Sequence, residues 1–397
     1  MVQMRRRQSW KQLWRKLRRR GTLALLASGL VCTAAACQPV KQGAAGHPAA
    51  EAPASAPVQP VSGVQEPAAS STPSAPVYRA PLTGMELPQK ADNRPVMVMV
   101  NNHPSARPQS GLSQADLLYE SLAEGEITRL VAVFQSRSFT DPIGPVRSIR
   151  PYFIELGKGL GAIQVHAGGS PDAYTQLDRE KIADLDEITN AGPFFWRESF
   201  RKAPHNLYTN LDKIRAGAEK RGLNRSVPDA AVFRFIPNGD EAVQTLGTDK
   251  APRYGAETPA AAEAQKVDVT FLLKSYKVSY EFDAASRLYK RFINGVKHID
   301  LNNSEQLTAS NVIVMGTDHR VLDSEGRQEV RLTGTGRAMV FQQGKMRQVE
   351  WRRDKENDPI RYFDQGREVS LMPGQTHILI VPVKPSFESH VAYGPLS

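Results

Sequence analysis

The chain has 397 residues, 40% of them hydrophobic, so it is long enough for more than one domain with an apolar core. Its formal net charge of +10 would suggest a nucleic-acid partner, but nine of the 51 basic residues lie between Arg5 and Arg20. The other 42 basic residues nearly balance the 41 acidic ones, so the rest of the chain lacks the positive field that nucleic-acid binding needs.

Residues 1–36 have the pattern of an export signal. A basic segment precedes an apolar run at 22–33 that is too short to span a membrane comfortably. Three alanines then lead to Cys37, as at the cleavage site of bacterial lipoproteins, where the cysteine thiol receives a diacylglyceryl lipid (palmitate is a typical acyl chain). We therefore predict a cell-membrane lipoprotein, anchored through Cys37 on the extracytoplasmic face.

Other interpretations of this segment remain open. An ordinary secretory signal, an uncleaved membrane anchor and, from Arg6 and Arg7, a twin-arginine signal are the alternatives. Cys32 is removed with the signal and Cys37 carries the lipid, so the folded domains have no free thiol. A disulfide, a cysteine nucleophile and a cysteine-ligated metal are thereby excluded.

Residues 37–79 are rich in Ala, Pro, Ser and Gly and contain few large apolar side chains. Such a segment cannot bury enough surface to offset the entropy of ordering it. We predict that it is a disordered tether between the lipid anchor and the first folded domain.

Residues 80–226 are predicted to form an α/β domain. Apolar runs predict buried strands at 94–101, 127–135 and 161–165. Helical spacing and capping residues predict helices at 113–120, 147–156, from Pro171, and at 211–221. Because strands and helices alternate, we expect a mixed or mostly parallel sheet.

Residues 227–397 are predicted to form a β-rich (α+β) domain. Short runs of alternating polarity are separated by turn pairs such as Asn294-Gly295 and Gln343-Gly344. No fixed repeat period is present.

The strand ends of the first domain carry the residues that could bind a ligand, because ligands of α/β sheets lie beyond the carboxyl ends of the strands. The candidates are Arg107, Arg129, Arg147, Arg150, His166, Gly168, Gly169, Ser170, His205 and Asn206. The Gly168–Ser170 turn precedes a predicted helix, whose first N–H groups favour an anion. Arg147 and Arg150 are three residues apart and would share a helix face. We predict an anion site, although a plain strand-to-helix turn and solvated arginines would give the same pattern.

Catalytic motifs are absent from the sequence, including the G-x-S-x-G, H-E-x-x-H and phosphate-loop patterns. Asp116, Glu120 and His166 are the candidates for acid–base chemistry, and structural partners of arginine are the alternative for them. His103, His166 and His205 lack metal-ligand spacing, so we predict neither a metal nor a cofactor.

Several blocks of the chain together resemble the YerB-like lipoprotein family. In the first half these are residues 94–103, 106–112, 115–116, 124–129, 144–148, 166–170 and 204–208, and in the second half 289–291, 311–314 and 374–375. The resemblance implies a two-domain extracytoplasmic lipoprotein of Gram-positive bacteria, and it brings no biochemical activity with it. Glu126 departs from the family pattern, which has a second glycine after Gly125.

Three hypotheses for function follow. The first is a module that binds an anionic envelope polymer or lipid-linked precursor through Arg107, Arg147 and Arg150. The second is a cell-wall phosphotransferase or hydrolase, since the order of Arg and Asp segments and a Gly-rich turn is loosely similar to that of LytR-type phosphotransferases. The third is a structural lipoprotein whose β-rich domain recruits another envelope protein, with the polar blocks serving as internal Arg–acid networks.

Overall fold

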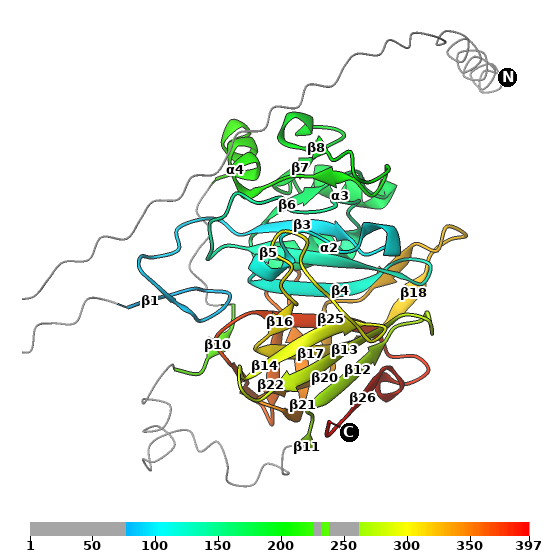
Figure 1. The fold of residues 1–397 in the computed structure, drawn as a ribbon. Coiled ribbons are helices and arrows are strands. Elements are labelled where there is room, and N and C mark those ends of the chain that lie inside the picture. Colours follow the sequence, from blue (N-terminus) through cyan, green and yellow to red (C-terminus); the bar gives the residue numbers. More distant parts are fainter. Residues whose placement is uncertain (1–76, 225–231, 238–261, 397) are drawn as a thin grey trace, which may run out of the picture. The chain divides into compact units, whose positions relative to one another are not determined.

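The computed structural model describes residues 77–224, 232–237 and 262–396, all of which lie in one compact unit (Figure 1). The predicted signal, the predicted tether up to residue 76 and the domain boundary at 226/227 fall outside the described residues, whereas Tyr78 and Arg79, predicted as the end of the tether, form a short strand. No helix in the described part of the chain is long and apolar enough to cross a membrane.

The first half contains the three α-helices of the described residues. They are α2 (Pro151–Gly159), α3 (Pro171–Arg179) and α4 (Leu211–Lys220). Its strands are β1 (Tyr78–Arg79), β2 (Glu86–Leu87), β3 (Val96–Asn101), β4 (Leu117–Glu124), β5 (Ile127–Phe134), β6 (Ile163–His166), β7 (Asp184–Asp186), β8 (Trp196–Arg197) and β9 (Leu207–Tyr208).

The second half consists of strands and one short 3-10 helix, Phe387–His390. The strands are β10 (Arg234–Phe235), β11 (Ala262–Glu263), β12 (Lys266–Thr270), β13 (Lys277–Asp283), β14 (Leu288–Ile293), β15 (Val296–Lys297), β16 (Thr308–Ala309), β17 (Asn311–Thr317), β18 (His319–Val321), β19 (Gln328–Val330), β20 (Gly334–Gln342), β21 (Lys345–Arg353), β22 (Arg361–Asp364), β23 (Arg367–Glu368), β24 (Ser370–Leu371), β25 (Thr376–Pro382) and β26 (Val391–Gly394).

One twelve-stranded sheet runs through both halves. Its order is β23-β22-β21-β20-β17-β25-β4-β5-β3-β6-β7, with β11 beside β21. β25, close to the end of the chain, lies between β17 and β4 and is parallel to both. The sheet is mixed, because β4, β5 and β3 are antiparallel neighbours whereas β3, β6 and β7 are parallel. The structure is therefore sheet-rich, and the mostly parallel arrangement is not what it adopts.

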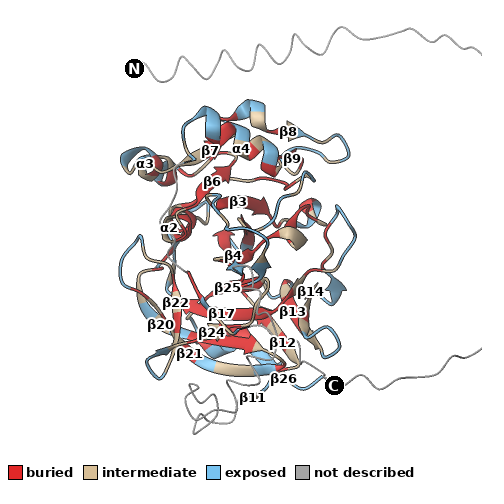
Figure 2. Ribbon diagram, turned by 90° about the vertical axis from the view of Figure 1, so that its left-hand side faces the viewer, coloured by how far each residue is buried: buried red, intermediate tan, exposed pale blue. Residues whose placement is uncertain are grey.

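The central strands are buried on both sides (Figure 2), which explains their continuous apolar sequences. In the first half, α2 covers one face through residues such as Phe153, and α4 covers the other through Leu211 and Ile214. In the second half a six-stranded sheet, β15-β14-β13-β12-β26 with β16 beside β14, packs on β17 and β25. The core of the molecule thus extends across both halves.

One predicted helix is wrong, and a second begins later than predicted. Residues 117–124 form β4, because their apolar side chains are buried on both faces, where a short apolar run cannot be told from a helix by spacing. The helix expected at 147–156 begins only at Pro151. The residue before a proline disfavours helical angles, so Arg150 is the extended N-cap, and Arg147 is not on the helix.

Candidate functional site

A polar cluster lies at the carboxyl end of β3 and the adjacent amino end of β5, which is antiparallel to it. Arg129 on β5 is the register partner of Asn101 on β3 and of Ser121 on β4, so their side chains share one sheet face. The segment that includes Val146 pairs with the end of β3 opposite Val100, which places Arg147 on this same face. The structure therefore brings Arg129 and Arg147 together through strand register, and not through a shared helix.

Ion pairing in this cluster is incomplete. Glu124 pairs with Arg129 at 3.0 Å (Oε2 to a terminal guanidinium nitrogen) and also with Arg150. Arg129 additionally donates to the Ser148 carbonyl oxygen at 2.7 Å. Arg147 has no ion pair or side-chain hydrogen bond among the described residues, so the only ion pairs of the three arginines are those of Arg129 and Arg150 with Glu124 in this part of the chain.

Burial makes this excess of positive charge costly. The Nε atoms of Arg129, Arg147 and Arg150 are buried and have no hydrogen-bond partner in the described part of the chain. Arg129 is only 4% exposed, and burial lowers its pKa to about 10. Burial and the nearby Arg129 guanidinium also lower the pKa of Arg147. An anion bound here would neutralise the charges and occupy unused donors.

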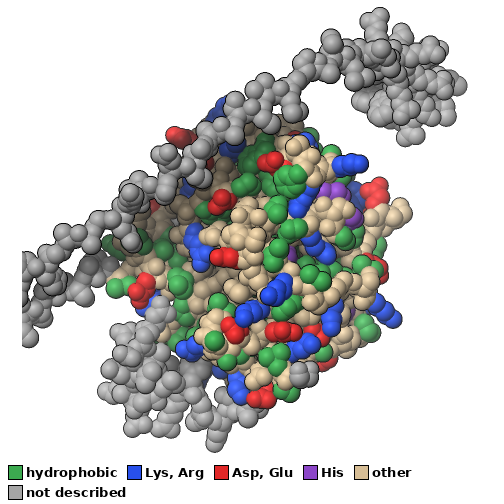
Figure 3. Space-filling view, in the orientation of Figure 1, with side chains coloured by type: hydrophobic (Ala, Val, Ile, Leu, Met, Phe, Trp, Pro, Cys, Tyr) green, Lys and Arg blue, Asp and Glu red, His purple; other side chains and the backbone are tan. Residues whose placement is uncertain are grey.

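Two histidines and a further arginine extend the cluster. His205 accepts a hydrogen bond from Asn101 Nδ2 at 2.8 Å through Nδ1, and its ring stacks on His103 with centroids 4.6 Å apart. Burial lowers the pKa of His205, as do the neighbouring His103, Arg147 and Arg201. Histidines lie among Lys and Arg side chains on the face seen in Figure 3.

Arg201 was not singled out from the sequence. It donates to the carbonyl oxygen of Ala106 at 2.6 Å and to that of Pro108, and within the described ranges it contributes charge without a carboxylate partner. Asn206, a predicted site residue, holds the same loop by donating to the Glu198 carbonyl oxygen at 3.0 Å. The Arg-Lys pair at 201–202 before Pro204 was the available signal in the sequence.

The Gly168–Ser170 turn already binds an internal carboxylate. Gly168 N–H donates to Asp186 Oδ1 at 2.7 Å, and Ser170 N–H donates to the Ile149 carbonyl oxygen. Ser170 Oγ caps α3 by accepting from Ala173 N–H. These N–H groups are therefore engaged, and Gly169 completes a turn that packs against Ile149. His166 is fully buried beneath the turn, with Nδ1 2.9 Å from the Gly168 carbonyl oxygen.

Arg107 belongs to a second, buried polar network between the halves of the chain. It donates through Nε to Asn102 Oδ1 at 3.1 Å and lies over the Tyr276 ring. Tyr276 OH donates to Glu120 Oε1 at 2.6 Å, and Glu120 is paired with the buried Arg291. Here the arginine–acid contacts are internal, as the structural alternative anticipated.

The three candidates for acid–base catalysis are all buried. Asp116 accepts from the N–H groups of Gln135 and Ser136 at 2.6 and 2.8 Å, and it lies beside Val133, four residues along β5 from Arg129. That spacing corresponds to roughly 13 Å. Glu120 and His166 are held in the contacts above, so the structure does not assemble the three with the open arginine cluster. Among the described residues no group of His, Cys, Asp or Glu is placed to hold a metal ion.

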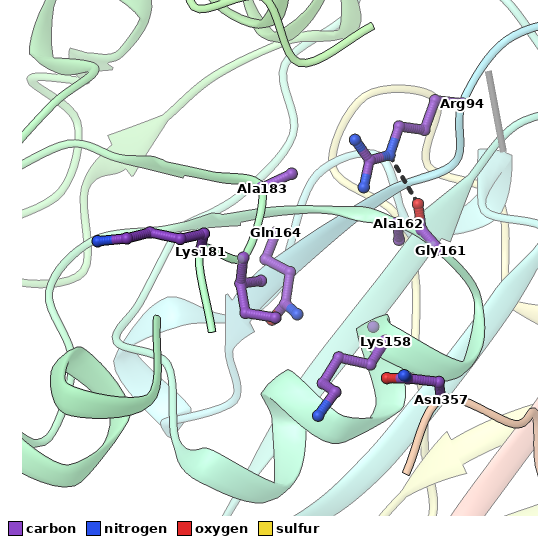
Figure 4. A pocket seen from close by; sticks show the side chains of 10 residues that line it. Arg94, Lys158, Gly161, Ala162, Gln164, Lys181, Ala183 and Asn357 are labelled. Atoms are coloured by element: carbon purple, nitrogen blue, oxygen red, sulfur yellow. Dashed lines mark hydrogen bonds between the residues drawn. The ribbon is translucent and has the colours of Figure 1, made fainter. Parts of the chain in front are cut away.

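One cavity of about 200 Å³ lies at the opposite ends of these strands, lined by Arg94, Lys158, Gln164 and Lys181 among others (Figure 4). Its cations already have partners. Arg94 donates to the Gly161 carbonyl oxygen at 2.7 Å, Lys158 pairs with two glutamates, and Lys181 pairs with an aspartate. The cavity is therefore a weaker anion site than the arginine cluster.

Comparisons with known proteins identify relatives for both halves. Residues 82–224 match the N-terminal domain model, and residues 267–378 the C-terminal domain model, of the "Protein of unknown function (DUF3048)" family. The chain is 36% identical over 305 residues to the "Putative lipoprotein YerB" of Bacillus subtilis (strain 168), covering 77% of this chain and 86% of that protein. It also matches the crystal structure of YerB from Bacillus subtilis, with a TM-score of 0.67 and 33% identity over 80% of this chain and 99% of that one.

Proposed function

Because this chain belongs to the DUF3048 family of YerB-like proteins, we propose that it is an extracytoplasmic, lipid-anchored protein that binds an anionic envelope ligand at the cluster of Arg129, Arg147 and Arg150. The relative's designation as a lipoprotein supports the anchor at Cys37. The observation that carries the binding site is Arg147, a partly buried guanidinium beside Arg129 with no carboxylate partner among the described residues.

The proposal follows from the difference in electrostatic energy between the ligand-free and the ligand-bound protein. Like charges held close in a poorly solvated site repel each other, so the free protein is less stable than it would be with a neutral side chain at 147. A phosphate or carboxylate ligand removes this repulsion and accepts the unused guanidinium hydrogen bonds. The arrangement resembles a binding site in which some stability is given up for function.

The test uses the chain from residue 38 onward, without lipid, and inorganic pyrophosphate as the probe. We expect pyrophosphate to raise the melting temperature, since a ligand at 100 times its Kd adds about 2.7 kcal/mol to the unfolding free energy. Arg147→Gln should abolish this rise while leaving the ligand-free protein equally or more stable. Arg320→Gln, at an exposed arginine on β18, is the matched control and should behave like the wild type.

Absence of a rise in the wild type, or an unchanged rise in Arg147→Gln, would refute the binding site. The anchor is tested separately by cell fractionation. Cys37→Ser should release the protein from the membrane fraction, and retention there would contradict lipid anchoring at this cysteine.

A further inference from the structure

The loop between β8 and β9 exposes an aromatic side chain among basic residues. Phe200 is 59% exposed, and the guanidinium carbon of Arg201 lies 5.3 Å from the centre of its ring. Arg197 and Lys202, on either side, are also exposed. A large apolar side chain held in water by a short loop loses contacts that it could make elsewhere.

A second apolar side chain stands beside the same cluster. Ile188 is 65% exposed and covers Gly168, next to the Ser148 hydroxyl. The adjacent Glu187 contacts Arg197 at 3.4 Å, which links Ile188 to the β8–β9 loop. Ile188 thus lies near Ser148, the residue after Arg147, and Phe200 lies against Arg201, which neighbours His205.

These residues form a surface that we call the basic–apolar surface: Arg147, Ile188, Arg197, Phe200, Arg201 and Lys202. Its overall charge is positive. Its four basic residues outnumber the neighbouring acids, which are Glu187, Glu198 and the buried Asp186. A soluble anion would use the cations alone and leave both apolar side chains in water. An anionic membrane uses both, because apolar side chains enter the acyl boundary while Arg and Lys meet lipid phosphates.

We propose that the basic–apolar surface docks on an anionic phospholipid membrane, and that the anion bound near Arg147 is the phosphate of a lipid head group. This inference rests on the proposed function and names its ligand class. The occupant is argued from charge complementarity together with two exposed apolar side chains, Ile188 and Phe200, beside the cationic residues. Docking by this surface would hold the folded part flat against the membrane to which the chain is expected to be anchored.

The test measures binding of the lipid-free chain, from residue 38 onward, to vesicles of phosphatidylglycerol and of phosphatidylcholine. We expect binding to phosphatidylglycerol only, weakened by salt. Phe200→Ser should weaken it about five-fold or more, and Lys202→Glu on the order of ten-fold or more. The matched controls are Val296→Ser and Lys297→Glu on β15, where Val296 is 70% exposed, and they should bind like the wild type.

The outcomes separate this inference from the proposed function. Pyrophosphate binding without vesicle binding would overturn membrane docking and leave the anion site standing. Vesicle binding that is unaffected by Phe200→Ser would overturn it too, since the interaction would then be that of a simple polyanion binder. Vesicle binding lost in Phe200→Ser but retained in Arg147→Gln, with no response to pyrophosphate, would overturn the anion site and with it the placement of the lipid phosphate near Arg147.

Discussion

Arg291 is buried and Arg147 is partly buried, and their electrostatic surroundings are opposite. Arg291 faces the Glu120 carboxylate and the Tyr280 hydroxyl, and the charge and hydrogen bonds of these neighbours outweigh desolvation and raise its pKa. Arg147 has another guanidinium for a neighbour, and its pKa is lowered. The first arrangement stabilises the fold, whereas the second leaves a charge available to a ligand.

Removing the buried Arg291 should therefore be severe. Arg291→Met leaves Glu120 as an uncompensated buried charge, and we expect the free energy of unfolding to fall by about 3–5 kcal/mol. Denaturant unfolding would measure it, and adding Glu120→Gln should recover part of the loss. A single variant within about 1 kcal/mol of the wild type would contradict a stabilising role for this pair.

Buried histidines should make the protein sensitive to acid. Burial, together with the charge of Arg291, holds the pKa of both His298 and His377 well below the usual value, and burial lowers that of His319 to about 4. Below about pH 6.5 these histidines bind protons in the unfolded chain but not in the folded chain. The contribution that the neutral histidines make to the unfolding free energy is therefore complete above that pH and is lost progressively as the pH falls below it.

We expect each such histidine to cost about 1.4 kcal/mol of unfolding free energy per pH unit below 6.5, down to its folded-state pKa. Denaturant unfolding at pH 7.5, 6 and 5 measures the slope. His298→Gln, which cannot ionise, should reduce the slope by one histidine's share. An identical slope in the variant would mean that His298 is already charged in the folded state.

Among the secondary-structure elements, prediction from the sequence was most accurate where the hydrophobic pattern or the capping residues fitted only one type of element. The runs that became β3, β5 and β6 are rich in Val and Ile, and α3 has a capping Ser170 followed by Pro171. β4 was misjudged because its short apolar run also fits a helix, and because one of its two neighbours, β25, is more than 250 residues away in the sequence. The candidate site could be predicted only in part, because its assembly also depends on contacts between segments that are distant in the sequence. Arg129 and Arg147 were identified as residues, but their proximity depends on strand register, and Arg291 became a partner of Glu120 only through the fold.

The role of Ser170 follows from its position at the start of α3. As the N-cap of α3 it should contribute to stability and not to ligand binding. Ser170→Ala should lower the unfolding free energy by about 1 kcal/mol and leave the pyrophosphate response unchanged. Asn210→Ala, at the N-cap of α4, is the comparable variant and should show a similar loss. A lost pyrophosphate response in Ser170→Ala alone would return the Gly168–Ser170 turn to the binding site.

For the whole molecule, the central position of β25 has a direct consequence. The last part of the chain lies between β4 of the first half and β17 of the second, so neither half can complete the large sheet alone. We expect one cooperative thermal transition by calorimetry, and no cooperative transition for residues 77–224 in isolation. Two separate transitions, or a stable isolated first half, would show that the halves are energetically independent.

The most direct test of the anion site is NMR observation of the arginine Nε–H groups during titration with pyrophosphate, with the Arg147 signal assigned by comparison with Arg147→Lys. The Nε atoms of Arg129, Arg147 and Arg150 have no partner among the described residues, so an anion in the cluster must change their surroundings. We predict that the Arg147 signal shifts and saturates, and that the Arg129 and Arg150 signals follow with the same Kd. An Arg147 signal that stays in place while exposed arginines such as Arg320 shift would contradict the account.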